Sequence, residues 1–377
     1  MRILFYDIKN NLFLLRTYYD IAKHIKMKLN KDGLLLRELI KREDIELLNY
    51  VPNISCNEKM KDYITFKVNG IDSKRIKSID TIEEINEDDI YIAWYYYSSH
   101  MDLMKDLNCK KVVMGQHFIR LSYNTNFSKM NIDYFVNQIN VQNNQFVNYF
   151  FDLKNVNCIA LPYSYETRFK NQKNFEDRKN KAMSVGTIAT LMGKGYDTYL
   201  EFFDTACCQP MRKKIYDVGN NEFIDVYNTY IFTTGYNNGI KPNMSLLQYI
   251  RQKKEEKCER TQGKYFSYNI VDKYNEYKMC VCAEELVGLP GIGFVESMAC
   301  GCAYIGIDHD MYRSLGLIPG EHYISYDGTY EDLIRKIEYY QNNESKLSQI
   351  AIKGREFVLE KFAEKKVMDD FITTILQ

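Results

Sequence analysis

Short apolar runs alternate with longer amphipathic stretches along most of the chain. The short runs read as buried strands and the amphipathic stretches as helices, which together indicate βαβ units. The expected strands are residues 2–6, 90–94, 111–115, 134–136, 158–161, 182–185, 230–234, 279–283, 303–307 and 322–325. The expected helices are residues 14–26, 101–107, 194–203, 330–341 and 345–371. The pattern therefore predicts an α/β fold with parallel sheets.

A polar segment divides the chain near its middle. Residues 168–181 are mostly polar and charged, a composition typical of linkers between domains. A chain of 377 residues is also too long for a single core of ordinary size. We therefore expect two Rossmann-like domains, residues 1–172 and 173–362. The C-terminal helix, residues 363–377, is expected to pack back on the first domain.

Charge and cysteine content narrow the class of protein. Lys plus Arg and Asp plus Glu both number 50, so we expect no basic field and no nucleic-acid partner. No stretch approaches the roughly 18 apolar residues of a membrane-spanning helix. Asp7 and Lys9 interrupt the opening apolar run, so we expect no signal peptide. The ten cysteines are then expected to be reduced thiols in a cytoplasmic protein.

The clearest candidate for chemistry is the glycine-rich segment GLPGIGFVESMACG, residues 288–301. Glycines let backbone N–H groups approach a ligand closely, and the start of a following helix favours anions such as phosphate. Glu296 would lie in the first turn of that helix, where its oxygens can accept hydrogen bonds from a ribose diol. The same pattern also fits a tight loop entering a packed αβ unit. The motif alone does not decide between the two.

Other motifs surround this loop in a characteristic order. Val185-Gly186-Thr187 ends a strand, Lys194-Gly195 opens a helix, and residues 274–282 precede the loop. In this order they resemble the donor-binding domain of the family 4 glycosyltransferases, also called glycosyl transferases group 1. The first half resembles the family more weakly, through residues 116–117, 132–136 and 159–169. The resemblance implies a GT-B fold, with two Rossmann-like domains facing a cleft, and retaining transfer from a nucleotide sugar.

The resemblance also implies roles for individual residues of the second half. Glu296 would hold the ribose hydroxyls, and Lys194 would face the charge that develops on the leaving diphosphate. A cation is unfavourable at a helix start unless an anion is present, which favours this role for Lys194 over that of an exposed lysine. The remaining donor-binding candidates are Gly186, Thr187, Gly291, Ile292, Gly293 and Phe294.

Two positions depart from the family pattern. Thr187 stands where the family usually has a basic residue, so it can donate a hydrogen bond but brings no charge. The family's first glutamate would fall at Gly288, eight positions before Glu296. Either Glu285 takes its place near the reacting sugar, which we favour, or that carboxylate is missing and Glu284 and Glu285 are only strand-end charges.

The first half supplies three further candidates. His117 follows an expected strand and matches the family's histidine near the donor sugar, although a histidine there can also be structural or simply exposed. Asn10 and Asn11 follow the first strand, where the family often has glycines that contact phosphate or acceptor. Asparagine tolerates left-handed backbone. We therefore assign both asparagines to an acceptor-side loop.

Two patterns with metal-ligand spacing receive a different interpretation. Residues 308–310, Asp-His-Asp, follow a strand of the second domain, where a polar loop suffices. The pairs Cys280/Cys282 and Cys300/Cys302 fit buried strands of a reduced core better than a zinc site. We therefore expect neither a metal nor a cofactor.

The function expected from the sequence is that of a metal-independent, retaining glycosyltransferase. It would move a hexose from a UDP- or GDP-sugar to a glycan, glycolipid or glycoprotein acceptor, in keeping with a role in cell-surface polysaccharide biosynthesis. The alternative is a catalytically degenerate homologue that binds a nucleotide sugar or a partner protein. Basic residues within 168–181 and 251–257 leave peripheral contact with the inner membrane face open, although interspersed acidic residues favour a solvated linker.

Overall fold

The chain forms two compact units. The computed structural model describes residues 1–8, 31–53, 55–68, 70–94, 98–115, 130–151, 153, 155–190, 202–205, 207–232 and 268–377. Unit 1 comprises residues 1–162 and 364–377, and unit 2 comprises residues 163–363. Each unit is built on a parallel β-sheet of its own, so the α/β fold class expected from the sequence is confirmed. Within the described residues, the helices are too short or too polar to cross a bilayer.

Unit 1 holds a parallel sheet in the order β3-β2-β1-β4-β5-β6-β7. The strands are β1 (Arg2–Tyr6), β2 (Glu46–Tyr50), β3 (Ile76–Ile79), β4 (Ile90–Ala93), β5 (Lys110–Met114), β6 (Tyr134–Asn137) and β7 (Asn157–Ala160). The chain starts in the middle of the sheet and reverses direction beside β1, which is the order of a doubly wound Rossmann-like fold. Strands β2 and β3 were not expected, because their apolar runs are short and interrupted by polar residues.

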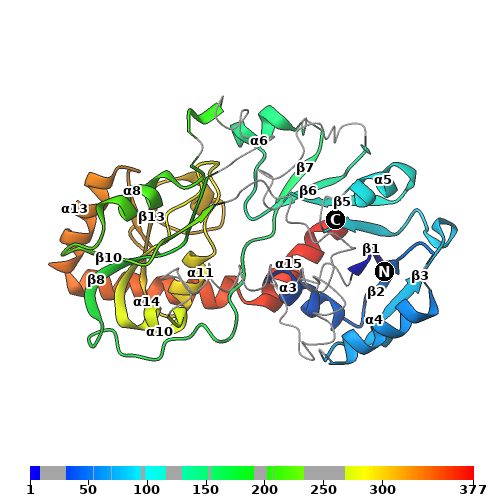
Figure 1. Ribbon diagram of the computed structural model, residues 1–377, viewed down its shortest axis with the longest axis horizontal. Helices are drawn as coiled ribbons and strands as arrows, with labels where there is room; N and C mark the ends of the chain where they lie inside the picture. Colours follow the sequence, from blue (N-terminus) through cyan, green and yellow to red (C-terminus); the bar gives the residue numbers. More distant parts are fainter. Residues whose placement is uncertain are drawn as a thin grey trace, which may run out of the picture. The chain divides into compact units, whose positions relative to one another are not determined.

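The helices of unit 1 include one from the far end of the sequence. They are α3 (Lys31–Ile40), α4 (Cys56–Val68), α5 (Ser98–Asp106), α6 (Gln145–Phe150) and α15 (Glu364–Leu376), with short 3₁₀ turns at Ser73–Arg75 and Ile82–Glu84. Figure 1 shows the red helix α15 beside the dark-blue helix α3. Arg37 pairs with Glu364 at 3.1 Å and Arg42 with Asp369 at 3.0 Å, so ion pairs flank this packing.

Unit 2 holds a five-stranded parallel sheet in the order β10-β8-β12-β13-β14 and a two-stranded sheet, β11-β9, within the described residues. The strands are β8 (Lys179–Ser184), β9 (Thr187–Thr190), β10 (Ile224–Val226), β11 (Thr229–Phe232), β12 (Tyr277–Val281), β13 (Ala303–Ile307) and β14 (Ile324–Tyr326). Strand β9 follows β8 after Gly186, whose φ of 114° interrupts the strand. The small sheet is thus a separately paired continuation of β8 and β10 beyond their carboxyl ends.

Alternate residues of the unit 2 strands pack on opposite faces. The helices are α8 (Pro210–Val218), α10 (Ile270–Glu276), α11 (Gly293–Ala299), α12 (Asp310–Arg313), α13 (Tyr330–Gln341) and α14 (Glu344–Lys361). Ala303 and Ile305 of β13 join the apolar core with α8, α13 and α14. Tyr304, on the other face of β13, packs against Phe294 of α11 and Tyr312 of α12. Figure 1 shows the orange helix α13 beside the green strand β8.

The polar segment expected to be a linker packs on unit 2. Asn275 of α10 donates from Nδ2 to the carbonyl of Lys170 at 3.1 Å and accepts from the backbone N–H of Gln172 at 2.7 Å. Phe169 packs against Tyr274 with ring centroids 6.1 Å apart. Residues 163–172, which we assigned to the first domain, therefore lie in unit 2, and the division falls after Pro162. Polar composition suggested a solvated linker because the sequence does not show these long-range hydrogen bonds.

The single long helix expected over residues 345–371 is wrong. The structure has two helices, α14 and α15, separated at Phe362 and Ala363. The Phe362 ring packs against Phe294 and Phe357, and its carbonyl accepts a hydrogen bond from the backbone N–H of Tyr165. These tertiary contacts end the helix in a sequence that contains neither proline nor glycine at this point.

Candidate functional site

The candidate donor-binding residues of unit 2 lie at the carboxyl ends of neighbouring strands. Strands β8 and β12 pair in parallel, so the turn after β8 and the segment after β12 emerge at one edge of the sheet. The first turn contains Gly186 and Thr187. The segment after β12 contains Glu285 and Gly291 and runs into α11. Open α/β sheets bind ligands at this edge.

The turn at Gly186 is fixed from one side by a buried polar pair. Ser184 donates from Oγ to Oδ1 of Asn228 at 2.6 Å, and Asn228 donates from Nδ2 to the carbonyl of Gly186 at 3.2 Å. Ser184 and Asn228 are both buried. The positive φ of Gly186 is readily adopted only by glycine. The backbone here is therefore held in one conformation without a ligand.

A buried arginine fixes the same turn from the other side. Arg212 of α8 is 4% exposed and donates from Nη1 to the carbonyl of Thr187 at 2.9 Å. Its Nε donates to the carbonyl of Ala283, just after β12, and its Nη2 lies 3.8 Å from Sγ of Cys282. Burial alone would lower the pKa of Arg212, but Cys282, Glu285 and other acidic groups outweigh that effect and raise it. The guanidinium is therefore charged, and it joins the ends of β8 and β12.

The glycines of the loop are explained in part by this packing. A methyl group on Gly291 would lie 2.6 Å from Nη2 of Arg212 and 2.8 Å from Sγ of Cys282. A methyl group on Gly293 would lie 2.7 Å from the same sulfur and 3.2 Å from the hydroxyl of Tyr274. Larger side chains would displace these neighbours. The interpretation as a tight loop entering a packed αβ unit therefore accounts for Gly291 and Gly293. The interpretation as a ligand-binding loop stays a prediction.

Glu296 lies in the first turn of α11, which the glycine loop leads into. Its backbone N–H donates to the carbonyl of Ile292 at 3.4 Å, and the Tyr274 hydroxyl donates to its Oε2 at 3.4 Å. Glu296 is partly exposed, whereas Phe294 beside it is fully buried. Phe294 thus packs in the core of the unit, and the carboxylate of Glu296 is the polar group that this turn offers to a ligand.

The two glutamates after β12 occupy different environments. Glu284 is buried, and its Oε1 accepts hydrogen bonds from the Tyr312 hydroxyl at 2.6 Å and from the backbone N–H of Ile307 at 3.0 Å. Burial raises the pKa of Glu284. Glu285 is partly exposed and opens a tight turn in which its N–H donates to the carbonyl of Leu289 at 2.9 Å. Of the two, only Glu285 is placed where a ligand at this edge could meet it.

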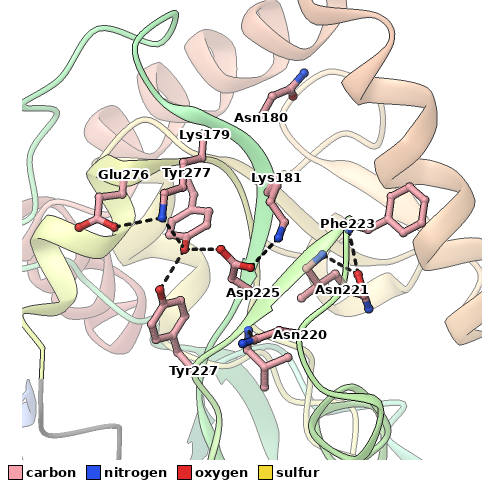
Figure 2. Close-up of polar contacts among 12 residues, drawn as sticks. Lys179, Asn180, Lys181, Asn220, Asn221, Phe223, Asp225, Tyr227, Glu276 and Tyr277 are labelled. Carbon is pink, nitrogen blue, oxygen red and sulfur yellow. Dashed lines mark hydrogen bonds and ion pairs between the residues drawn. The ribbon is translucent and has the colours of Figure 1, made fainter.

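A second polar network supports the same sheet. Figure 2 shows the Tyr277 hydroxyl between Asp225 and Tyr227, at 2.6 Å and 2.9 Å. Lys181 donates to Asp225 at 2.6 Å, and Lys179 donates to the Tyr277 hydroxyl at 3.3 Å. These residues come from β8, β10 and β12 and the turn after β10. The network joins the three strands and positions the turn that carries Asn228.

Four of the predicted site residues lie outside the described residues. These are Asn10, Asn11, His117 and Lys194. The described cysteines are all free thiols, and all but Cys56 are buried. Burial raises the pKa of Cys280 and Cys282, which keeps both thiols protonated. Within the described residues, no three His, Cys, Asp or Glu side chains gather as metal ligands would.

Arg212 was missed by the sequence analysis. The segment PMRKKIYDV carries three basic residues and reads as an exposed helix. The signal that could have found it is spacing, because Arg212 lies three residues before Ile215 and therefore on the same helix face. Arg212 and Ile215 are the buried residues of α8.

The sequence match to a known family covers the last third of the chain. Residues 252–373 match the model of a family described as glycosyl transferase-like. This span includes the glycine-rich loop and Glu296. A search of curated protein sequences gives no match.

Solved structures resemble the whole chain at low sequence identity. Sucrose-phosphate synthase from Thermosynechococcus elongatus has a TM-score of 0.50 and 11% identity, over 99% of this chain and 98% of that one. HepE from Anabaena, in complex with UDP and glucose, has a TM-score of 0.52 and 9% identity, over 100% and 99%. The fold is GT-B. A glycosyltransferase from Rickettsia africae ESF-5 has a TM-score of 0.50 and 12% identity, over 99% of this chain and 97% of that one.

The GT-B fold and the family match agree on one class of enzyme. Together they support a glycosyltransferase of the group 1 type, a transferase of class EC 2.4. The GT-B fold expected from the sequence is confirmed.

Proposed function

We propose that this protein transfers a hexose from a UDP- or GDP-linked donor to a glycan or lipid-linked acceptor, with retention at the anomeric carbon and without a metal. The observation that carries the proposal is the edge of the unit 2 sheet. Two glycine turns, at Gly186 and Gly291, meet there above a buried guanidinium, and Glu296 follows in the next helix. The solved complex of HepE with UDP and glucose has the same fold and supports a nucleotide-sugar donor.

The proposed roles follow from the chemistry of the leaving group. Breaking the bond to a sugar leaves negative charge on a diphosphate, which preorganised donors stabilise. Lys194, Thr187 and the loop residues 291–294 would surround that diphosphate. Glu296, oriented by the Tyr274 hydroxyl, would accept hydrogen bonds from the ribose. Since Lys194 would provide a cation at the leaving group, the proposal requires no metal ion.

The other predicted residues would act at the sugar and the acceptor. Glu285 would lie near the reacting sugar, and His117 would hydrogen-bond to it. Asn10 and Asn11 would contribute to an acceptor-side loop. In a retaining transfer without a covalent intermediate, the acceptor hydroxyl attacks from the face that the diphosphate leaves, so the leaving phosphate can receive the proton.

The test is binding followed by turnover. Nucleotide sugars with UDP and GDP should raise the melting temperature, because a ligand that binds only the native state stabilises it increasingly as its concentration exceeds the dissociation constant. The donor that binds should be hydrolysed slowly, and nuclear magnetic resonance should show the released sugar first in the anomeric form of the donor. Activity should survive chelation by EDTA. Inversion, or activity rescued only by Mn²⁺ or Mg²⁺, would refute the mechanistic part.

A second candidate function is favoured by one observation. Thr187 brings no charge to the first turn, where the resembled family usually has a basic residue. A catalytically degenerate homologue would bind a nucleotide sugar without turning it over. Tight binding with no hydrolysis and no transfer to any acceptor would favour this alternative.

A further inference from the structure

Arg212 is a buried cation that makes no salt bridge within the part of the chain that the structure describes, although Glu285 and Glu284 lie close enough to raise its pKa. Its hydrogen bonds go to two backbone carbonyls, those of Thr187 and Ala283, and its remaining contact is with a protonated thiol, Cys282. The nearby carboxylate of Glu284 accepts from Tyr312 and Ile307 instead. An isolated buried charge is costly unless something compensates it. Two carbonyl dipoles and the more distant charges of Glu285 and Glu284 compensate the guanidinium here without a salt bridge.

A second buried arginine shows what a purely structural role looks like. Arg178 is also 4% exposed. It donates to the carbonyl of Cys300 at 2.8 Å, to that of Tyr274 at 3.2 Å and to Oδ1 of Asn171 at 2.7 Å. It directly precedes β8, at the opposite end of that strand from Gly186. Its hydrogen bonds fasten the incoming chain to unit 2.

Arg212 differs from Arg178 because it lies against both glycine turns. A methyl group on Gly186 would lie 3.0 Å from its guanidinium, and one on Gly291 would lie 2.6 Å from Nη2. Only backbone therefore separates the charge from the side of these turns that faces away from the core. An anion bound at the outer side of these turns would therefore lie close to the guanidinium.

We propose that Arg212 is a positioning residue that supplies the positive charge of the donor diphosphate subsite from beneath the two glycine turns. The inference rests on the proposed function, since it assigns a residue to that same site. The guanidinium holds the carbonyls of Thr187 and Ala283, which fixes the turns relative to each other. Its permanent charge favours a diphosphate over a neutral group at the same place.

The test compares a charged with an uncharged ligand. Dissociation constants for UDP and uridine, and for GDP and guanosine, are measured by calorimetry or by nuclear magnetic resonance titration for the wild type, R212K and R212M. R212M should weaken diphosphate binding by about 10- to 100-fold relative to the nucleoside. R212K should recover part of that selectivity, because lysine keeps the charge but cannot reproduce the forked hydrogen bonds.

The matched control is R178M. It should lower the melting temperature, because it also removes a buried arginine, but leave the preference for diphosphate over nucleoside unchanged. An equal preference in R212M and the wild type would overturn the inference. If R212M does not fold, R212Q replaces it, since glutamine keeps a donor for one carbonyl and lacks the charge. A wild type that binds neither nucleoside diphosphate would overturn the proposed function itself, which is a separate result.

Discussion

At the scale of single residues, the position of a carboxylate decides its chemistry. Glu284 and Glu285 are adjacent, yet one is buried under Tyr312 and the other opens a turn at the sheet edge. Because burial raises the pKa of Glu284, its ionised form destabilises the fold as the pH rises above the ordinary value of 4.5. Hydrogen bonds from Tyr312 and Ile307 offset this effect. Glu284 is thus a structural residue.

The two glutamates should respond differently to substitution by glutamine. E285Q should lower turnover by roughly 10²-fold, the scale of one group that stabilises charge in the transition state. E284Q should keep near-normal turnover, because an amide oxygen can still accept from Tyr312 and Ile307. Initial rates with a saturating donor measure the turnover of both variants. Full activity in E285Q would contradict the role of Glu285, and equal losses in both variants would point to a shared structural effect.

Sequence reasoning at this scale succeeded where local pattern carries the information. Glu296 in the first turn of a helix after clustered glycines can be read from spacing alone. For Arg212, spacing indicates only the helix face, because its partners, Thr187 and Ala283, lie 25 and 71 positions away. The sequence analysis explained the glycines only in part, because their packing partners are also distant in the sequence. The sequence does not show that Gly291 is small because a guanidinium lies against it.

At the scale of elements, side-chain hydrogen bonds help to hold the strand β10 in its sheet, because the strand has only three residues. Asp225 accepts from Lys181 and Tyr277, as Figure 2 shows. Burial alone would raise the pKa of Asp225, but these two hydrogen bonds outweigh it, so the pKa lies below its ordinary value of 3.8. An acid with a lowered pKa in the folded state stabilises the fold above its unfolded pKa, and loses that effect as the pH falls through the folded value.

D225N should therefore destabilise the protein in a pH-dependent way. At pH 7 the free energy of unfolding should fall by about 1.5–3 kcal/mol, the scale of a hydrogen bond to a charged group. The difference from the wild type should shrink below pH 3.8. Urea unfolding of both proteins at several pH values measures this difference in the free energy of unfolding. The control D217N alters an exposed pair with Lys213 and should change little at any pH. A pH-independent loss in D225N would contradict the assignment.

The elements found from the sequence are those with an uninterrupted pattern. Strand β13 and helix α13 agree with the predicted residues 303–307 and 330–341. Strand β10 was missed because three residues give no periodicity, and its place in the sheet depends on partners in β8. The division between α14 and α15 was missed because Phe362 ends the helix through tertiary contacts rather than through a local signal.

At the scale of the whole molecule, the division into units does not follow the order of the sequence. Helix α15 follows the last helix of unit 2 but belongs to unit 1. It buries Val367, Phe371 and Ile375 there, among others, and the Ile375 carbonyl accepts from Lys110. The stability of unit 1 therefore depends on residues that follow the whole of unit 2 in the sequence.

F371A should reveal this dependence. Removal of a buried phenylalanine costs about 3–5 kcal/mol, and calorimetry should show the loss in the transition of unit 1. The melting temperature of unit 2, which a nucleotide sugar should raise, should not change in F371A. The control I352A removes a side chain that is 54% exposed on α14 and should change neither. If F371A lowered both melting temperatures by the same amount, the expectation that the two units unfold independently would be wrong.

The bridge between Tyr165 and Ala363 has a consequence for engineering. The chain enters unit 2 just before Tyr165 and leaves it just after Ala363, and the backbone N–H of Tyr165 donates to the carbonyl of Phe362. Unit 2 is thus an insertion whose two ends meet, the arrangement in which domain insertion and circular permutation succeed. Residues 163–363 form a single continuous cassette that can be expressed alone or exchanged for another domain. Unit 1 could be closed into one chain by joining residue 162 to residue 364 through a short peptide.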